Sequence, residues 1–236
     1  NAEKLLVDFG DDGAFRSIGV SSPDVNGNYW NGIGATNVAS DLVDQANTPT
    51  AIDIYFTSAY GVDSYNGPAG DTSDGSGGWI SNSVSNTSFN ADQLGDFGVT
   101  NAVYDYVSGA AITNLSGATT GRSNFTFRIA DLDPSKYYEL TFYGSLKYPA
   151  TPDTNDIDTC TTRYSATGGN GTYSDDLQLG VFSKNNLGAV ASLVMTPSAS
   201  NDIEVVVSGL ASNTLTGLNA MSIEVLDEEL AALTNQ

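Results

Sequence analysis

The sequence contains no histidine, a single cysteine and few cationic residues, with only 8 Lys and Arg side chains in 236 residues. Without histidine, the chain lacks the base of the usual Ser-His-Asp and Cys-His nucleophilic schemes and the ligands of histidine-based zinc sites. One cysteine, Cys160, excludes an intrachain disulfide and a thiolate metal cluster. The fold must therefore be held by its hydrophobic core, for which a chain of this length suffices.

Negative charge dominates the chain. The 28 Asp and Glu residues against 8 Lys and Arg give a formal net charge of -20 at pH 7. This charge repels nucleic acids, anionic membranes and polyanionic glycans over long range, and no segment approaches the roughly 20 apolar residues of a membrane span. We expect no nucleic-acid and no membrane partner, and favour a neutral partner or a cation. An adaptation of solubility to salt is the alternative reason for the acidity.

The polar residues are mainly Asn, Ser, Thr, Gly and Asp, since charged residues make up only 15% of the chain. This composition is typical of extracellular, loop-rich proteins, so we predict a secreted protein. The length is within the range of one β-rich domain. We predict a single domain over 1–226, with a tail or the start of a linker over 227–236.

The hydrophobic pattern has period two far more often than 3.6, which predicts strands rather than helices. Strand-like runs fall at 4–10, 51–58, 124–132, 137–146, 176–183, 189–197, 201–210 and 219–226. Short strands separated by turn residues predict an all-β fold, an antiparallel β-sandwich or jelly roll. Helical spacing is limited to a short helix over 35–46 and one or two turns after residue 226.

Two long segments lack this strand pattern. Residues 57–98 contain the turn signals "NGPAG", "SDGSGG" and "LGDFG" with few apolar residues and no clear strand, and 147–164 is rich in Pro and Asp. Segments this long without regular structure inside a compact domain are usually functional or disordered. We predict that 57–98 is a loop insertion and that both segments form the binding apparatus.

Several phrases carry a family resemblance. The most telling are "LDPSKYYELTFYGS", then "TRY", then "LNAM", within a longer series from "LLVDFG" to "GLNAMSIEVL". In this order they resemble the galactose-binding-domain-like β-sandwich modules attached to secreted polysaccharide-degrading enzymes of bacteria. Leu146 stands where related modules often have arginine. The resemblance implies a non-catalytic carbohydrate-binding module, commonly with a bound calcium ion, that belongs to a larger multidomain enzyme.

The residue types in the polar loops fit sugar binding. The C–H faces of sugars stack on aromatic rings and their hydroxyls require polar partners, so a binder places aromatics in polar loops. The candidate ligand-binding residues are Trp79, Tyr60, Tyr65, Tyr148, Arg163, Asp153, Asn155, Trp30 and Asn31. Trp79 has a lid over the core as its alternative role, Trp30 has packing at the sandwich edge, and Arg163 has a local ion pair with an aspartate.

Calcium is the cofactor that the Asp-rich loops favour, because Ca²⁺ takes carboxylate and carbonyl oxygens. Asp8 ends the first predicted strand, and Asp105 lies in "VYDYV". Asp71 and Asp74 lie in an oxygen-rich run before Gly75 that resembles part of an EF-hand loop but lacks its downstream Glu. These four residues are the candidate metal ligands.

Three functions from different classes remain open. The leading one is a monomeric, non-catalytic module that binds a polysaccharide or oligosaccharide. A glycoside hydrolase or polysaccharide lyase is the second, because 28 acidic residues allow a catalytic carboxylate pair. A lyase must neutralise the substrate carboxylate, for which 8 basic residues and no histidine equip the chain poorly. A calcium-stabilised adhesion or surface domain is the third.

Overall fold

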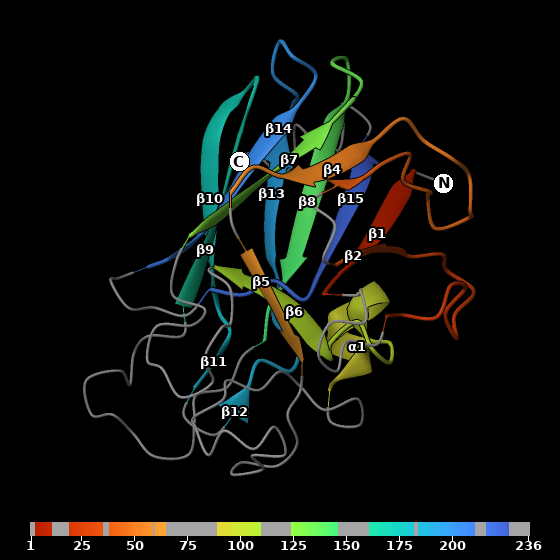
Figure 1. Ribbon diagram of the computed structural model, residues 1–236, viewed down its shortest axis with the longest axis vertical. Coiled ribbons are helices and arrows are strands. Elements are labelled where there is room, and N and C mark those ends of the chain that lie inside the picture. Colours follow the sequence, from red (N-terminus) through yellow and green to blue (C-terminus); the bar gives the residue numbers. More distant parts are fainter. Residues whose placement is uncertain are drawn as a thin grey trace.

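The computed structural model describes residues 3–10, 19–34, 38–58, 60–64, 89–109, 124–145, 161–181, 184–210 and 216–226. In this part the chain forms two main β-sheets that pack face to face as a sandwich (Figure 1). The predicted all-β, mainly antiparallel sandwich is confirmed. No helix among the described residues is long and apolar enough to cross a membrane.

The first sheet has five strands in the order β13-β8-β15-β1-β2. Their bounds are Ala191–Met195, Tyr137–Tyr143, Ala220–Leu226, Lys4–Phe9 and Asn31–Ile33. Neighbouring strands are antiparallel except for the pair of β1 and β2, which is parallel.

The second sheet has six antiparallel strands in the order β10-β9-β14-β7-β4-β3. Their bounds are Gly171–Gln178, Thr161–Gly168, Ile203–Gly209, Phe125–Ala130, Asp53–Phe56 and Val38–Ala39. The smaller elements are β5 (Tyr60–Ser64) paired with β6 (Asp105–Gly109), β11 (Gly180–Val181) paired with β12 (Lys184–Asn185), helix α1 (Ala91–Leu94) and the 3-10 helix η1 (Gly95–Phe97).

The main core lies between the two sheets. Strand β7 alternates buried Phe125, Phe127 and Ile129 with half-buried residues, as a strand with one face on a core must. Across the sandwich, the rings of Phe142 and Tyr164 stack with centroids 4.8 Å apart. The alternation of β7 agrees with the period-two pattern that predicted a strand over 124–132.

A second, smaller core covers part of the outer face of the five-stranded sheet. Its buried members are Leu6, Trp30, Leu94, Phe97, Val99, Ala102, Val103, Tyr143 and Ala220. Leu94 and Phe97 come from α1 and η1, which lie beside the sheet in Figure 1. Leu6 and Tyr143 are thereby buried although their side chains lie on the outer face, because the helical segment covers them.

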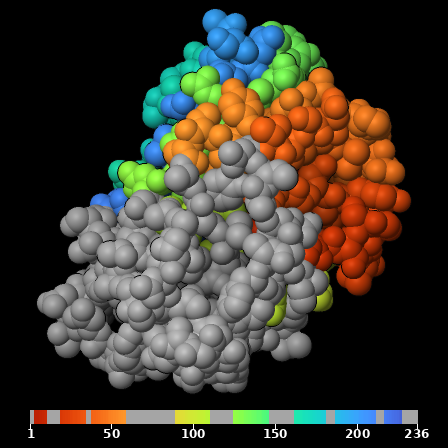
Figure 2. Space-filling model, viewed as in Figure 1, coloured from red at the N-terminus to blue at the C-terminus, as the bar shows by residue number. Residues whose placement is uncertain are grey.

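The strands give the sandwich two distinct ends. Strands β1, β2, β4, β8 and β14 end, and β7, β9 and β15 begin, at one end of the sandwich, which we name the Ser145 end. The opposite end, which we name the Asn170 end, has the short turns 131–136, 169–170 and 196–202. In Figure 1 the Asn170 end is at the top, and the arrow of β8 points down towards the Ser145 end. The turns of the Asn170 end form the green and blue top of the space-filling view (Figure 2).

Some local predictions were wrong. No helix forms over the described residues 38–46, where strand β3 and a bridge between Val43 and Pro49 occur instead. The Asn31 side chain binds both backbone groups of Val43, which favours extended chain over the predicted helix. Within 57–98, which was predicted to have no strand, the structure has β5 and the helices α1 and η1.

The strand pattern after residue 160 was also only partly predicted. Strand β9 occupies Thr161–Gly168, a stretch assigned partly to a loop, and β10 begins at Gly171 rather than at 176. Both strands have outward-facing polar residues and few apolar ones, so periodicity of hydrophobic residues did not reveal them. Strand β9 pairs with β14, and β10 pairs with β9, which places both strands in the sheet.

Candidate functional site

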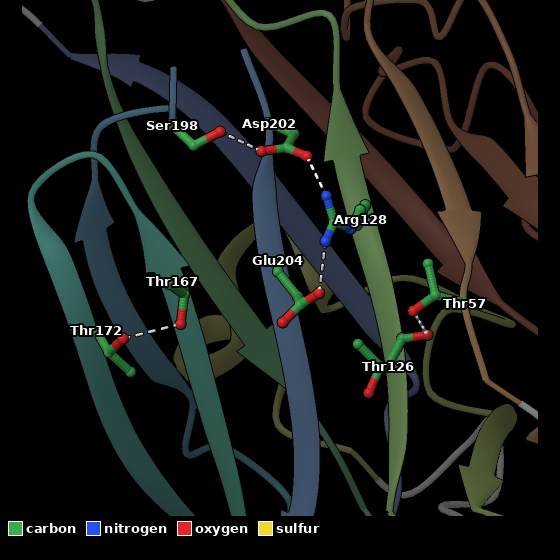
Figure 3. A network of polar contacts seen from close by, with 8 residues as sticks. All are labelled: Thr57, Thr126, Arg128, Thr167, Thr172, Ser198, Asp202 and Glu204. Atoms are coloured by element: carbon green, nitrogen blue, oxygen red, sulfur yellow. Dashed lines mark hydrogen bonds and ion pairs between the residues drawn. The ribbon is translucent and has the colours of Figure 1, made fainter. Parts of the chain in front are cut away.

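Two surfaces of a β-sandwich commonly bind ligands, the outer face of a sheet and the loop end. On the outer face of the six-stranded sheet, Arg128 of β7 lies between Asp202 and Glu204 (Figure 3). Its guanidinium donates at 2.5 Å to Asp202 Oδ2 and at 2.9 Å to Glu204 Oε2, and the Ser198 hydroxyl also donates to Asp202. Hydrogen bonds to Glu204 and Asp202 raise the pKa of Arg128 above its ordinary value.

Two pairs of hydroxyl side chains on this face bond to one another. The Thr167 and Thr172 hydroxyls are 2.9 Å apart (Figure 3), and those of Ser165 and Ser174 are 2.8 Å apart. A sugar that bound here would have to replace these internal hydrogen bonds with its own hydroxyls, at little net gain. The outer face is therefore the weaker candidate.

Two further cations of the described surface, Lys4 and Arg163, are also engaged. Lys4 Nζ lies 2.8 Å from Asp96 Oδ2 and 3.2 Å from Glu224 Oε2. The Arg163 guanidinium binds both carboxylate oxygens of Asp176 at 2.7 and 2.9 Å, which lowers the pKa of Asp176. Together with Arg128, these residues do not present uncommitted positive charge to an anionic ligand.

The Ser145 end has a layer of buried polar side chains beneath it. Asn219 is fully buried just before β15, and its Oδ1 accepts the Ser145 N–H at 2.8 Å. Its Nδ2 donates to the Val103 carbonyl at 3.2 Å, and its backbone N–H donates to the Tyr143 carbonyl at 2.9 Å. One asparagine thus fixes the chain where β8 ends and ties it to the segment after η1.

Asn186 has a similar role between β12 and β13. Its Nδ2 donates to the carbonyls of Gly144 at 3.0 Å and Ala189 at 2.8 Å, and its Oδ1 accepts the Ala189 N–H at 2.8 Å. The Tyr143 hydroxyl donates to the Asn186 carbonyl at 2.8 Å. These bonds satisfy backbone groups that would otherwise be buried without partners.

Tyr164 completes this layer from β9. Its hydroxyl donates to the Gly217 carbonyl at 2.6 Å, and a Cβ on Gly144 would lie only 2.4 Å from its Oη, so that position admits no side chain. Burial raises the pKa of Tyr164 and of Tyr143 well above the ordinary tyrosine value. Both hydroxyls therefore remain protonated donors at neutral pH and hold the scaffold rather than act as bases.

Trp30 and Asn31, two predicted ligand-binding residues, lie inside the scaffold. The Trp30 side chain packs on Phe97 with ring centroids 6.4 Å apart, and its Nε1 donates to Asp24 at 2.9 Å. The residue is 6% exposed. Asn31 uses its amide on the backbone of Leu6 and Val43. These positions favour the packing alternative for both residues.

Of the other predicted ligand-binding residues, only Arg163 and Tyr60 lie within the described part of the chain. Arg163 lies exposed on β9 in its ion pair with Asp176, as its alternative role required. Tyr60 begins β5, with its side chain outside the described part. The remaining ones, Trp79, Tyr65, Tyr148, Asp153 and Asn155, lie outside the described residues, as do the metal candidates Asp71 and Asp74.

Asp8 and Asp105, the other metal candidates, are both buried at the Ser145 end. Asp8 pairs with Ala220 across β1 and β15, and its Oδ2 accepts the Val20 N–H at 2.8 Å. A Cβ on Gly10, two residues after Asp8, would lie 3.2 Å from Asp105 Cγ. The fold thus brings two hard oxygen donors into one region, although no cluster of three such side chains occurs among the described residues.

Asn186 and Asn219 were missed by sequence reasoning, as was the structural role of Tyr164. Asn219 lies within "LNAM", one of the phrases that carry the family resemblance, and an isolated Asn next to a strand carries no further signal. The partners of Asn219 and Asn186 are backbone groups brought near only by the fold.

No protein-family model matches the sequence, and no curated protein matches it. Among solved structures, a family 35 carbohydrate binding module from Clostridium thermocellum is 14% identical with a TM-score of 0.32, covering 69% of this chain and 96% of that one. The ANXUR1 extracellular domain from Arabidopsis thaliana is 13% identical with a TM-score of 0.41, covering 81% of this chain and 54% of that one. An exo-beta-1,3-galactanase from Phanerochaete chrysosporium is 12% identical with a TM-score of 0.28, covering 79% and 32%. Similarities this low carry no argument about what this chain binds.

Proposed function

We propose that this protein is a non-catalytic carbohydrate-binding module whose binding site lies at the Ser145 end. The observation that carries the proposal is the arrangement of the described strands: β4, β8 and β14 end there, and β7 and β9 begin there, over a rigid polar layer. The two segments predicted from sequence to bind sugar, 57–98 and 147–164, adjoin these strand ends. A rigid base under ligand-contacting segments lowers the entropy that binding costs.

A neutral glycan is the ligand class that the charge favours. The net charge of -20 repels polyanionic glycans. Lys4, Arg128 and Arg163 are engaged by carboxylates of the same chain, so they are poorly placed to bind a sugar acid. In a secreted multidomain enzyme, such a module would raise the local concentration of the catalytic domain on its polysaccharide, even with weak single-site affinity.

We propose calcium as a structural ion of the module, with Asp8 and Asp105 among its ligands. Two carboxylates in one buried region fit the hard oxygen chemistry of Ca²⁺. When bound, the ion would offset the negative charge of both side chains near the roots of the binding segments. Calcium therefore enters the test as a separate condition.

The test is affinity electrophoresis in gels that contain neutral or anionic polysaccharides, with calcium or with chelator. We expect retardation of the wild type on a neutral glycan and its loss in Trp79→Ala. The matched control is Tyr173→Ala, which removes an aromatic ring that is 46% exposed on β10, towards the Asn170 end. Tyr173→Ala should migrate like the wild type.

Other outcomes would overturn the proposal. Unretarded wild type on every glycan would favour an adhesion or surface domain, and release of reducing sugar from a retained glycan would favour a glycosidase. Equal loss of retardation in Trp79→Ala and Tyr173→Ala would move the site away from the Ser145 end. Equal behaviour and equal melting temperature in calcium and chelator would argue against the ion.

A further inference from the structure

One side of the sandwich is closed by side chains that bridge the edge strands of the two sheets. Strand β10 is the edge of the six-stranded sheet and β13 is the edge of the five-stranded sheet. Edge strands present backbone N–H and C=O groups that another strand can pair with, and natural proteins block such edges. Here the blocking groups come from β10 and the turn that precedes it.

Asp175 of β10 binds the edges of both strands with one carboxylate. Its Oδ2 accepts the Ser192 N–H of β13 at 3.0 Å. Its Oδ1 accepts the N–H of the next residue on its own strand, Asp176, at 2.9 Å. Each oxygen therefore occupies the place that a carbonyl of an added strand would take.

The turn between β9 and β10 covers the rest of the β13 edge. Asn170 Nδ2 donates to the Val194 carbonyl at 3.2 Å, and its Oδ1 accepts the Thr196 N–H at 3.0 Å. The Gly169 N–H donates to the Thr196 carbonyl at 2.8 Å. Ser192, Val194 and Thr196 are every second residue of the chain. Their backbone N–H and C=O groups therefore all point to the side of β13 that faces away from β8.

Glycines make this close approach possible. A Cβ on Gly168 would lie 2.1 Å from the Thr196 carbonyl oxygen, and one on Gly169 would lie 2.4 Å from that of Pro197. The backbone of the turn therefore contacts the end of β13 directly. Tyr173 holds the turn from the other side, since its hydroxyl donates to the Asn170 carbonyl at 3.1 Å.

We infer that Asp175, Asn170 and the Gly169 amide, which we name the edge clasp, prevent a second copy of this chain from adding its own strand to β13. The occupant to be excluded is another copy because the same β13 edge, once bare in two molecules, offers matching donors and acceptors for antiparallel pairing. The clasp thus keeps the protein from associating through the edge of β13.

The test compares Asp175→Asn with Asp176→Asn. Both changes remove one negative charge from neighbouring positions, but Asp176 pairs with Arg163 on the outer face and does not reach β13. In Asp175→Asn one acceptor oxygen becomes an NH2 donor, so only one of the two N–H groups keeps its partner. We expect amide exchange to quicken about tenfold at whichever of Ser192 and Asp176 loses its acceptor, the loss of one hydrogen bond, with no change at Ser192 in Asp176→Asn.

Association is measured by size-exclusion chromatography with light scattering. The double variant Asn170→Asp with Asp175→Asn should form dimers at concentrations where the wild type and Asp176→Asn remain monomeric. Adding Val194→Lys, which places a charge on β13, should restore the monomer while exchange at Ser192 stays fast.

Three results would overturn the inference. The first is a double variant that folds, exchanges quickly at Ser192 and stays monomeric at every concentration. The second is a dimer that survives Val194→Lys, because it would use another surface. The third is a wild type that forms the same dimer. If the double variant does not fold, the association of Asp175→Asn is compared with that of Asp176→Asn, and an Asp175→Asn variant that exchanges faster but stays monomeric at every concentration overturns the inference.

Discussion

The two ends of the sandwich are closed by contacts of different range. At the Asn170 end the turn 131–136 has local contacts, since Asp133 Oδ1 accepts the Ser135 N–H at 2.9 Å and the Ser135 hydroxyl at 2.7 Å, and Asn170 bonds to residues 24 and 26 positions away. At the Ser145 end the partners are remote, since Asn219 and Val103 are 116 residues apart and Tyr164 and Gly217 are 53 apart. The scaffold therefore uses hydrogen bonds of short and medium range in sequence at the Asn170 end, and hydrogen bonds between remote residues at the Ser145 end.

The largest expected effect is a difference between two asparagines, one at each end. Asn219 and Asn170 each use the side-chain amide on two backbone groups, but Asn219 is fully buried and Asn170 is half-buried. Asn219→Ala should lower the free energy of unfolding by about 2–4 kcal/mol, because two groups lose partners where water does not reach. Asn170→Ala should lower it by about 1 kcal/mol, because water replaces the amide.

Urea unfolding at low protein concentration measures both values. Equal losses of unfolding free energy in Asn219→Ala and Asn170→Ala would contradict this prediction, because they would mean that burial does not distinguish the two asparagines.

A smaller difference is expected between two tyrosine hydroxyls. Tyr164 donates to the Gly217 carbonyl in the buried layer, and Tyr173 donates to the Asn170 carbonyl at the surface. Tyr164→Phe should cost about 1–2 kcal/mol of unfolding free energy and Tyr173→Phe less than about 0.5 kcal/mol. Thermal unfolding of both variants checks this, and a larger loss in Tyr173→Phe would reverse the ranking of the ends.

The smallest effects are expected in the response to pH, and they have opposite signs for the buried tyrosines of the Ser145 end and the Asp133 carboxylate of the Asn170 end. Burial raises the pKa of Tyr164 and Tyr143 in the folded state, so the unfolded chain releases their protons first. The stability that depends on their neutral forms is complete below about pH 10 and falls as pH rises above it. The Ser145 end is thus sensitive to alkali.

At the Asn170 end the sensitive group is a carboxylate. Hydrogen bonds from Ser135 lower the pKa of Asp133 in the folded state. Its contribution is present above about pH 4, the unfolded value, and is lost as pH falls through the lower folded value. Urea midpoints between acid and alkaline pH should show Tyr164→Phe less sensitive to alkali than the wild type, and Asp133→Ala less sensitive to acid. If the urea midpoint of either variant depends on pH as that of the wild type does, the substituted residue does not cause the pH sensitivity of its end.

Much of the fold was predictable because strands with one face on a core must alternate. The runs at 4–10, 124–132, 201–210 and 219–226 contain β1, β7, β14 and β15 within a few residues. Strand β9 and most of β10 were not predicted, because the residues on their outer faces are hydroxyl and charged side chains that pair across strands. The short helix α1, which the Asn90 side chain caps, was not predicted because four residues are too few to show a helical period.

The sequence by itself determined the fold class, the strongly acidic surface and the exclusion of disulfide and histidine chemistry, because these follow from residue periodicity and composition. Only the tertiary structure decided that Trp30 packs inside a second core, that Asn219 and Asn186 fix the Ser145 end, and that Asp175 bridges two edge strands. Those roles depend on side chains and backbone groups from other parts of the sequence, which meet only when the sheets pack.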